Sequence, residues 1–392
     1  MTESAFPKRV NRTRVAWRGR TLTFFAGCDY FRMTTHPAVL RAVTEVLAGD
    51  GLSVAASRLT TGNHPIYRRL ERALARFFGT EAALLLPAGY ISNMAVTQAL
   101  AGRITHALID EKAHMSLADA ALFLQCPVLR FNHGDPADLA RQVRRLPRQT
   151  RVLVLTDGMF AHDGAAAPLT AYLRVLPRTA LLLVDDAHGA GVLGKTGQGT
   201  PEWAGVSRRR VIQTVTLSKA FGVYGGAVLC TAAFRRLMVA RSRLFGGCTP
   251  LPLPLASAAL AALRLHRRHP DLRQRLRNNT ERVKTALIRA GVSVPDTPGP
   301  IVTIVPGDAR QARALRRRLI EAGIYPSLTR YPGGPATGSY RFVISSQHTP
   351  QELDGLIAAL TAACAGVGPR GPTHPAGDRQ GYARRKMRLS LR

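Results

Sequence analysis

Two apolar runs, each followed by a chemically reactive residue, constrain the fold of this chain more than any other feature. Residues 180–184 are all apolar and lead into Asp185, with His188 three residues later. Residues 211–216 form a second β-rich run, and Lys219 follows it in a glycine-rich turn. Apolar runs of this length, bounded by turns, are typical of strands buried on both faces of a parallel sheet. In such sheets ligands bind beyond the carboxyl ends of the strands, which is where these three side chains fall.

A lysine, an acid and a histidine in this arrangement suit pyridoxal phosphate chemistry. The lysine amine attaches covalently to the aldehyde of the cofactor, and the acid keeps the pyridine nitrogen protonated so that the ring accepts electrons. Each residue also has a plainer interpretation. An Asp at a strand end can merely cap a turn, and a Lys in a glycine-rich loop is usually a solvated charge. Taken together, the three residues favour a cofactor site.

The surrounding motifs point to a known family. Residues 185–189 read Asp-Asp-Ala-His-Gly, and residues 216–222 read Thr-Leu-Ser-Lys-Ala-Phe-Gly. With these motifs the chain resembles the α-oxoamine synthases, which are fold-type I pyridoxal phosphate enzymes, and the resemblance extends in order from Phe24 to Ala362. It implies an α/β fold in which a mostly parallel central sheet is flanked by helices and followed by a smaller C-terminal α/β domain.

The resemblance also implies a reaction. An amino acid would be condensed with an acyl thioester, carried by coenzyme A or by acyl carrier protein, and decarboxylation would give an α-aminoketone. Lys219 would hold the cofactor and act as the base at the α-carbon, Asp185 would stabilise the protonated pyridine, and His188 would contact the phenolic oxygen of the ring. A homodimer with shared active sites is implied as well.

Further residues match cofactor-binding positions of the family. Residues 82–86 predict a strand, and the turn after it delivers a helix N-terminus, whose free amides and dipole favour a phosphate. The resemblance implies that the backbone amides of Gly89 and Tyr90 bind this phosphate and that His114 stacks on the pyridine ring. It assigns further phosphate contacts to Thr216 and, from the neighbouring subunit, to Thr249.

The substrate site departs from the family pattern in several places. Arg341 matches the arginine whose guanidinium forks onto the substrate carboxylate. Asp29 stands where the family has an asparagine near that carboxylate; an ionised Asp would repel it, so either Asp29 points elsewhere or the substrate is held differently. Ala161 replaces a serine that bonds the phenolic oxygen. Residues 53–56 replace glycines, and their added Cβ atoms should narrow or reshape the pocket.

The pattern along the chain predicts four parts. They are an arm and first segment (1–45) that begins as an extended or weakly ordered basic stretch, a large cofactor-binding domain (46–255), a small C-terminal domain (256–365) and a basic, disordered tail (366–392). An amphipathic helix is expected over 65–78. A helix leaves the large domain over 252–269, and the small domain should contain helices 280–290, 309–322 and 350–363 with strands 301–305 and 340–345.

Charge and composition exclude other classes. The chain has 55 Lys and Arg against 24 Asp and Glu, a net charge of +31, which raises the hypothesis of a nucleic-acid or acidic partner. No recognition helix or aromatic-interleaved strand accompanies the charge, so a specific nucleic-acid partner is not expected. No apolar run is long enough for a membrane span, and no secretory signal is visible. Five scattered cysteines without metal spacing suit a reducing cytoplasm and no metal.

Two other classes remain open. One is a pyridoxal phosphate enzyme of another reaction type, such as an aminotransferase or a retro-aldolase. The other is a basic, cofactor-binding protein that has lost catalysis. An NTPase is excluded, because residues 189–199 are rich in glycine but lack the G-x-x-x-x-G-K-[ST] spacing of a phosphate-binding loop.

Overall fold

A seven-stranded sheet forms the centre of the fold in the computed structural model, which describes residues 6–330 and 335–364. Its strand order is β4-β10-β9-β8-β7-β5-β6. Strand β10 pairs antiparallel with β4 and β9, and the other described pairs of this sheet are parallel, which confirms the prediction of a mostly parallel sheet. The strands are β4 (Ala82–Leu86), β5 (His106–Asp110), β6 (Val128–Phe131), β7 (Val152–Asp157), β8 (Leu181–Asp185), β9 (Val211–Thr216) and β10 (Gly226–Cys230).

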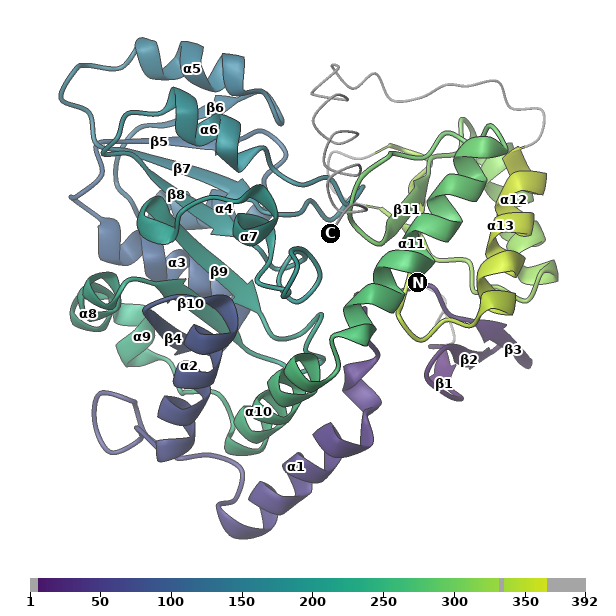
Figure 1. Ribbon diagram of the computed structural model, residues 1–392, viewed down its shortest axis with the longest axis horizontal. Helices are drawn as coiled ribbons and strands as arrows, with labels where there is room; N and C mark the ends of the chain where they lie inside the picture. The colour runs from purple at the N-terminus through teal and green to yellow at the C-terminus, as the bar shows by residue number, and fades with distance from the viewer. Residues whose placement is uncertain (1–5, 331–334, 365–392) are drawn as a thin grey trace.

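Both faces of this sheet are covered, which explains why its strands read as continuous apolar runs. Ala83 and Leu85 of β4 lie in one buried cluster with side chains of α2 and α10. Leu84 and Leu86 lie in another with side chains of α3, α4 and α8. The helices of this part (Figure 1) are α1 (Pro37–Gly49), α2 (Pro65–Phe78), α3 (Gly89–Leu100), α4 (Met115–Leu122), α5 (Pro136–Arg144), α6 (Leu169–Val175), α7 (Thr200–Ala204), α8 (Ala232–Arg241), α9 (Arg243–Gly247) and α10 (Leu253–Arg268).

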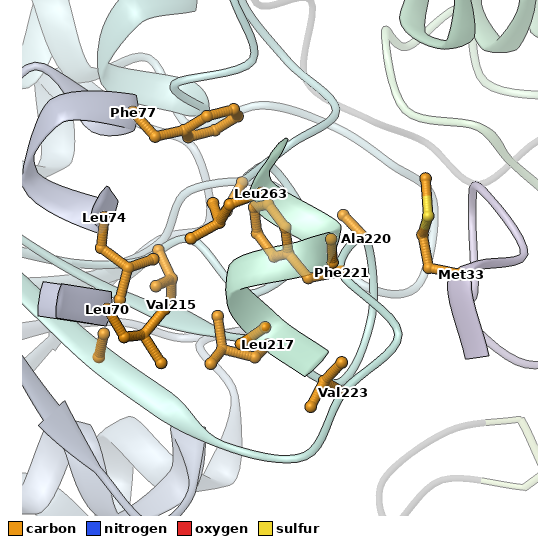
Figure 2. Close-up of a cluster of buried hydrophobic side chains, with 14 of the residues drawn as sticks. Met33, Leu70, Leu74, Phe77, Val215, Leu217, Ala220, Phe221, Val223 and Leu263 are labelled. Atoms are coloured by element: carbon orange, nitrogen blue, oxygen red, sulfur yellow. The ribbon is translucent and has the colours of Figure 1, made fainter. Parts of the chain in front are cut away.

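The turn after β9, which carries Lys219, is anchored in the first of these clusters. Phe221 is fully buried and meets Phe77 edge to face, with ring centroids 5.8 Å apart (Figure 2). Gly222 has φ +65°, and a Cβ there would lie 2.5 Å from the backbone nitrogen of Thr34. Only glycine tolerates both conditions, so the turn has one arrangement and Lys219 one direction.

A second, smaller sheet lies beside the first (Figure 1). Its order is β11-β13-β12, and all its pairs are antiparallel. The strands are β11 (Ile301–Ile304), β12 (Leu328–Thr329) and β13 (Ser339–Val343), and the helices are α11 (Asp271–Arg289), α12 (Ala309–Glu321) and α13 (Pro350–Cys364). Helix α11 begins nine residues before the expected helix over 280–290, because its first turns are polar and bury only Leu272, Arg273 and Leu276.

Of the two alternatives for the start of the chain, extended or weakly ordered, its described residues take the extended one. They form an antiparallel sheet of β1 (Lys8–Arg9), β2 (Arg14–Trp17) and β3 (Arg20–Thr23). Arg18 and Gly19 turn the chain with positive φ, and Val15 and Trp17 are buried. The backbone nitrogen of Thr23 donates to the carbonyl of Gly323 at 2.7 Å, which attaches this sheet to the segment between the helix that ends at Glu321 and β12.

The predicted partition of the chain stays a prediction. Helix α10, which the partition assigns to the C-terminal domain, packs against α1 and α2 of the large part. The tail 366–392 lies outside the described residues. Within the part of the chain that the structure describes, no helix combines the length and the apolar character that crossing a bilayer requires.

Candidate active site

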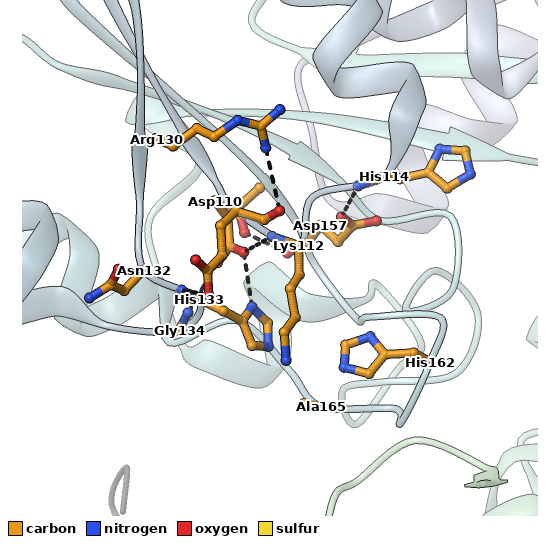
Figure 3. Close-up of polar contacts among 12 residues, drawn as sticks. Asp110, Lys112, His114, Arg130, Asn132, His133, Gly134, Asp157, His162 and Ala165 are labelled. Carbon is orange, nitrogen blue, oxygen red and sulfur yellow. Dashed lines mark hydrogen bonds and ion pairs between the residues drawn. The ribbon is translucent and has the colours of Figure 1, made fainter. Parts of the chain in front are cut away.

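Acidic side chains stand at the carboxyl ends of neighbouring parallel strands. Asp157 ends β7 and Asp185 ends β8, and the two residues are direct partners in the register. Burial and the adjacent Asp185 raise the pKa of Asp157 well above its usual value, although Asp157 also accepts a bond from the backbone nitrogen of His114 at 2.7 Å (Figure 3). Burial and the neighbouring acid thus favour the protonated form of Asp157.

Neutral donors hold the Asp185 carboxylate in place. Its Oδ2 accepts from Asn93 Nδ2 at 2.7 Å and from Ser116 Oγ at 3.2 Å. Asn93 is itself oriented, because its Oδ1 accepts from Thr214 Oγ1 at 2.6 Å. These bonds fix the carboxylate without neutralising it, so it is suited to face a cationic or protonated group of a ligand.

The adjacent acid, Asp186, has a structural role instead. Its carboxylate accepts from the backbone nitrogen of Thr200 at 2.8 Å and from Gln213 Nε2 at 2.6 Å, and burial raises its pKa to about 7. A Cβ on Gly189 or Gly199 would lie 2.1 or 1.8 Å from its oxygens. The glycines after β8 thus make room for this carboxylate.

Lys219 and His188 meet at the ends of β9 and β8. Lys219 Nζ lies 2.8 Å from His188 Nε2, and His188 Nδ1 lies 2.7 Å from the hydroxyl of Tyr30. Burial lowers the pKa of the Lys219 amine below its usual value, and burial followed by the charge of Lys219 lowers the pKa of His188 well below its own. A buried amine with a lowered pKa is prepared to act as a nucleophile and a base.

The turn before α3 packs closely against the end of β9. A Cβ on Gly89 would lie 2.8 Å from Thr216 Cβ, and one on Gly226 would lie 2.5 Å from the backbone carbon of Ala88. Helix α3 therefore begins at the strand end that leads to Lys219, with the free amides of its first turn at that point. The structure thus brings Gly89 and Thr216 into contact, and the phosphate role predicted for them stays a prediction.

His114 lies next to the residues that hold Asp185. Its Nδ1 is 2.8 Å from Ser116 Oγ, and Ser116 bonds Asp185. The rings of Tyr90 and His114 meet edge to face with their centroids 6.1 Å apart. The hydroxyl of Tyr90, a partly exposed residue, donates to Asp119. Figure 3 shows His114 beside Asp157. Asp110 and His133, whose Nδ1 lies 2.9 Å from Asp110 Oδ1, are found in the same view.

Arg341 reaches this site from the smaller sheet. Its Nε donates to the carbonyl of Ala161 at 2.8 Å, and its Nη1 lies 3.6 Å from the sulfur of Cys28. The three carbonyls after Ala161 also accept bonds from the smaller domain. The donors are Thr303 Oγ1 to His162 (2.5 Å), Thr297 Oγ1 to Asp163 (2.6 Å) and the nitrogen of Gly299 to Gly164 (3.0 Å).

Two predicted site residues do not join this group within one chain. The carboxylate of Asp29 accepts from the backbone nitrogens of Met33 and Thr34 and from the Thr34 hydroxyl, so it faces its own turn. This placement favours the alternative in which Asp29 points away from the substrate. Thr249 is exposed beyond α9. In the loop that replaces the family's glycines, Ala55 has φ +48°, a conformation that glycine adopts more easily.

The sequence did not single out several residues of the site. Most of them are polar residues that lie either at the end of a buried strand or in a segment that also carries a predicted site residue. Tyr30 and Cys28 flank Asp29, Ser116 follows His114, and Asp157 ends a buried strand as Asp185 does. Asn93 lies on the buried face of α3 among apolar neighbours.

The donor set fits pyridoxal phosphate. A buried amine of lowered pKa stands ready for an aldehyde, and a fixed carboxylate is available for a protonated nitrogen. The start of α3, which has no side-chain cap, offers backbone amides to a phosphate. No group of three or more His, Cys, Asp and Glu residues among the described ones could hold a metal ion.

Comparisons with known proteins agree with this geometry. Residues 28–360 match the family model "Aminotransferase class I and II". The 8-amino-7-oxononanoate synthase of Trichlorobacter lovleyi is 35% identical over 360 residues, covering 90% of this chain and 92% of that protein. The one from Thioalkalivibrio sulfidiphilus is 37% identical over 345 residues, covering 87% and 88%.

Solved structures of the same kind superpose closely. Serine palmitoyltransferase of Sphingomonas wittichii has a TM-score of 0.84 and 28% identity over 92% of each chain. A structure of SPT with its PLP internal aldimine has a TM-score of 0.85 and 27% identity over 91% of each chain. The chain therefore belongs to the class I and II aminotransferase family of pyridoxal phosphate enzymes, in its α-oxoamine synthase branch.

Proposed function

We propose that this chain is a pyridoxal phosphate-dependent acyltransferase that condenses an amino acid with an acyl thioester, with loss of carbon dioxide, to an α-aminoketone. Its activity is like that of the 8-amino-7-oxononanoate synthases, which cover about nine tenths of the chain, and it would serve biotin biosynthesis. The observation that carries the proposal is the Lys219–His188 contact beside the fixed carboxylate of Asp185. The cytoplasmic location expected from the sequence stays a prediction.

Each residue has a defined task in this reaction. When bound, pyridoxal phosphate supplies an electron sink for negative charge at the α-carbon of the amino acid. Lys219 holds the cofactor and moves the proton at that carbon, and Asp185 keeps the proton on the pyridine nitrogen. Arg341 binds the substrate carboxylate with its fork. Because Ala161 lacks a hydroxyl, His188 is the partner assigned to the phenolic oxygen.

The active enzyme in this proposal is a homodimer with shared sites. Thr249 is exposed in one chain, and it follows Gly246, whose carbonyl accepts from Ser57 at 2.6 Å. This segment and the loop that contains Ser57 thus form one surface, on which Leu52 and Leu59 are 69% and 55% exposed. Exposed apolar side chains of this size support burial against a second copy.

The reaction class is tested by product analysis. Purified protein supplied with pyridoxal phosphate is incubated with glycine, L-alanine or L-serine and with short, medium or long acyl-CoA, and free coenzyme A and carbon dioxide are measured. We expect both products in equal amounts, and only when an amino acid and an acyl-CoA are present together. Formation of a keto acid without coenzyme A would contradict acyl transfer and indicate an aminotransferase.

Removing the guanidinium of Arg341 should weaken amino-acid binding. Arg341→Ala is expected to raise the KM for the amino acid by about 10- to 100-fold, since two charge-assisted bonds to a carboxylate are lost. Arg341→Lys should recover only part of the loss, because an ammonium cannot fork. Arg289→Ala, an exposed arginine of α11, is the matched control in steady-state kinetics. An unchanged KM in Arg341→Ala would show that another group binds the carboxylate.

A further inference from the structure

Tyr30, to which the sequence analysis assigned no role, contacts His188 on the side of the imidazole opposite Lys219. Its side chain is fully buried, and its hydroxyl lies 2.7 Å from His188 Nδ1. On the other side of the same ring, Nε2 lies 2.8 Å from Lys219 Nζ. The three groups therefore form one continuous line of hydrogen bonds, in which the direction of one bond decides the direction of the next.

The imidazole in the middle of this line is neutral, because burial, Lys219, Arg341 and His114 all lower the pKa of His188. A neutral imidazole carries one proton, so one ring nitrogen donates and the other accepts. A phenol O–H is a stronger donor than an imidazole N–H, and an imidazole nitrogen is a stronger acceptor than a phenol oxygen. This difference favours the arrangement in which the Tyr30 hydroxyl donates to Nδ1 and the proton of His188 resides on Nε2.

We infer that Tyr30 is a positioning residue that fixes the Nε2–H tautomer of His188 and thereby holds the Lys219 amine as a neutral hydrogen-bond acceptor, ready to capture the aldehyde of the cofactor. Nε2–H points at Nζ, and a donor facing an ammonium would be repulsive. The competing arrangement is the opposite one, in which Nε2 accepts from a protonated Lys219, and the measurements below separate the two. The inference deepens the proposed function, since it names the residue that prepares Lys219 for its cofactor.

Other charges around the pair act on the same amine. Burial lowers the pKa of Lys219 most strongly. Of the groups that face Lys219, Cys28, Asp185 and Asp157 favour the ammonium and Arg341 disfavours it. Arg341 and His114 also face His188 and lower its pKa. Because Asp185 favours the ammonium, a tautomer that offers Nε2 as an acceptor would add to its effect. The hydroxyl of Tyr30 thus acts in the same direction as burial, which lowers the pKa of Lys219 against the effect of Asp185.

Capture of pyridoxal phosphate by the full chain freed of cofactor tests this inference directly. In the capture the lone pair of the neutral amine attacks the aldehyde carbon, a carbon–nitrogen bond forms and water leaves, so its rate follows the neutral fraction of Lys219. Tyr30→Phe keeps the ring and removes only the donor, which releases Nε2 to accept from the ammonium. We expect the pH profile of the capture rate to move up by about one unit, which slows capture at pH 7 about tenfold.

Tyr67→Phe is the matched control. Tyr67 is equally buried, and its hydroxyl donates to the carbonyl of Leu251 at 2.7 Å, away from the site. Coincident profiles for Tyr30→Phe and the unaltered protein, or an equal shift in Tyr67→Phe, would overturn the inference. The assay contains no acyl donor, so a failed acyl-transfer reaction would leave it untouched.

A second measurement needs no variant at all. Nitrogen NMR of the ring of His188 in the unaltered chain, assigned with His188→Gln, is expected to show the proton on Nε2 and an acceptor at Nδ1. A proton on Nδ1 would refute the inference, even if Tyr30→Phe did not fold.

Discussion

Lys219→Ala is expected to abolish covalent attachment of pyridoxal phosphate and to lower kcat by on the order of 10⁴-fold. The amine that attaches the cofactor is the one that moves the proton at the α-carbon, so one truncation removes both functions. After borohydride reduction, mass spectrometry should find the cofactor on the peptide with Lys219 in the unaltered protein and on no peptide of the variant. Retention of the modified peptide mass elsewhere in the variant would show that another lysine carries the cofactor.

Two further variants distinguish the role of the Lys219 amine from the role of its positive charge and from the general effect of removing a lysine. Lys219→Arg keeps a positive charge but not a nucleophilic amine, and it should be as inactive as the alanine variant. Lys195→Ala removes an exposed lysine of the glycine-rich loop after β8 and should retain cofactor and activity. Full activity of Lys219→Arg would mean that charge alone suffices at this position.

Asp185→Asn is expected to lower kcat by on the order of 10²- to 10³-fold while the protein stays folded. The amide has the same shape and can still accept from Asn93, but it lacks the charge that keeps the proton on the pyridine nitrogen. Steady-state kinetics with a thermal melt should show a loss in kcat at nearly unchanged Tm.

Asp138→Asn provides the comparison for this variant. Asp138 is also a buried carboxylate, and its oxygens accept from the backbone nitrogen of Asn132 at 2.7 Å and from Arg141, both far along the sheet edge from Lys219. It should keep its kcat even if its Tm falls. An Asp185→Asn enzyme as fast as the unaltered one would remove Asp185 from the catalytic machinery.

The sequence predicts well those parts of the fold that bury apolar side chains over short stretches of chain. Strands β8 and β9 could be predicted because each is covered on both faces, so that nearly all of their residues are buried and most are apolar. Helix α2 could be predicted from the apolar residues along one of its faces and from Gly79, which ends it with φ +63°. The reactive residues follow from these elements, since they lie directly after the strand ends.

Contacts between distant segments are what the sequence leaves out. Tyr30 and His188 are 158 residues apart, and Asn93 and Asp185 are 92 apart, so no local pattern links them. The sheet of β1 to β3 is hidden for a related reason. Its strands have at most four residues, many of them arginines, and they are held by the long-range bond of Thr23 to Gly323.

The four successive carbonyls of Ala161 to Gly164 have a mechanical consequence. Each accepts a bond from the smaller domain, so the loop formed by residues 161–164 is attached to that domain although it follows β7 of the large sheet. A rotation of the smaller domain would therefore move this loop as well, and Arg341 would keep its position relative to the backbone of Ala161. The hinge for such a rotation must therefore lie outside the loop.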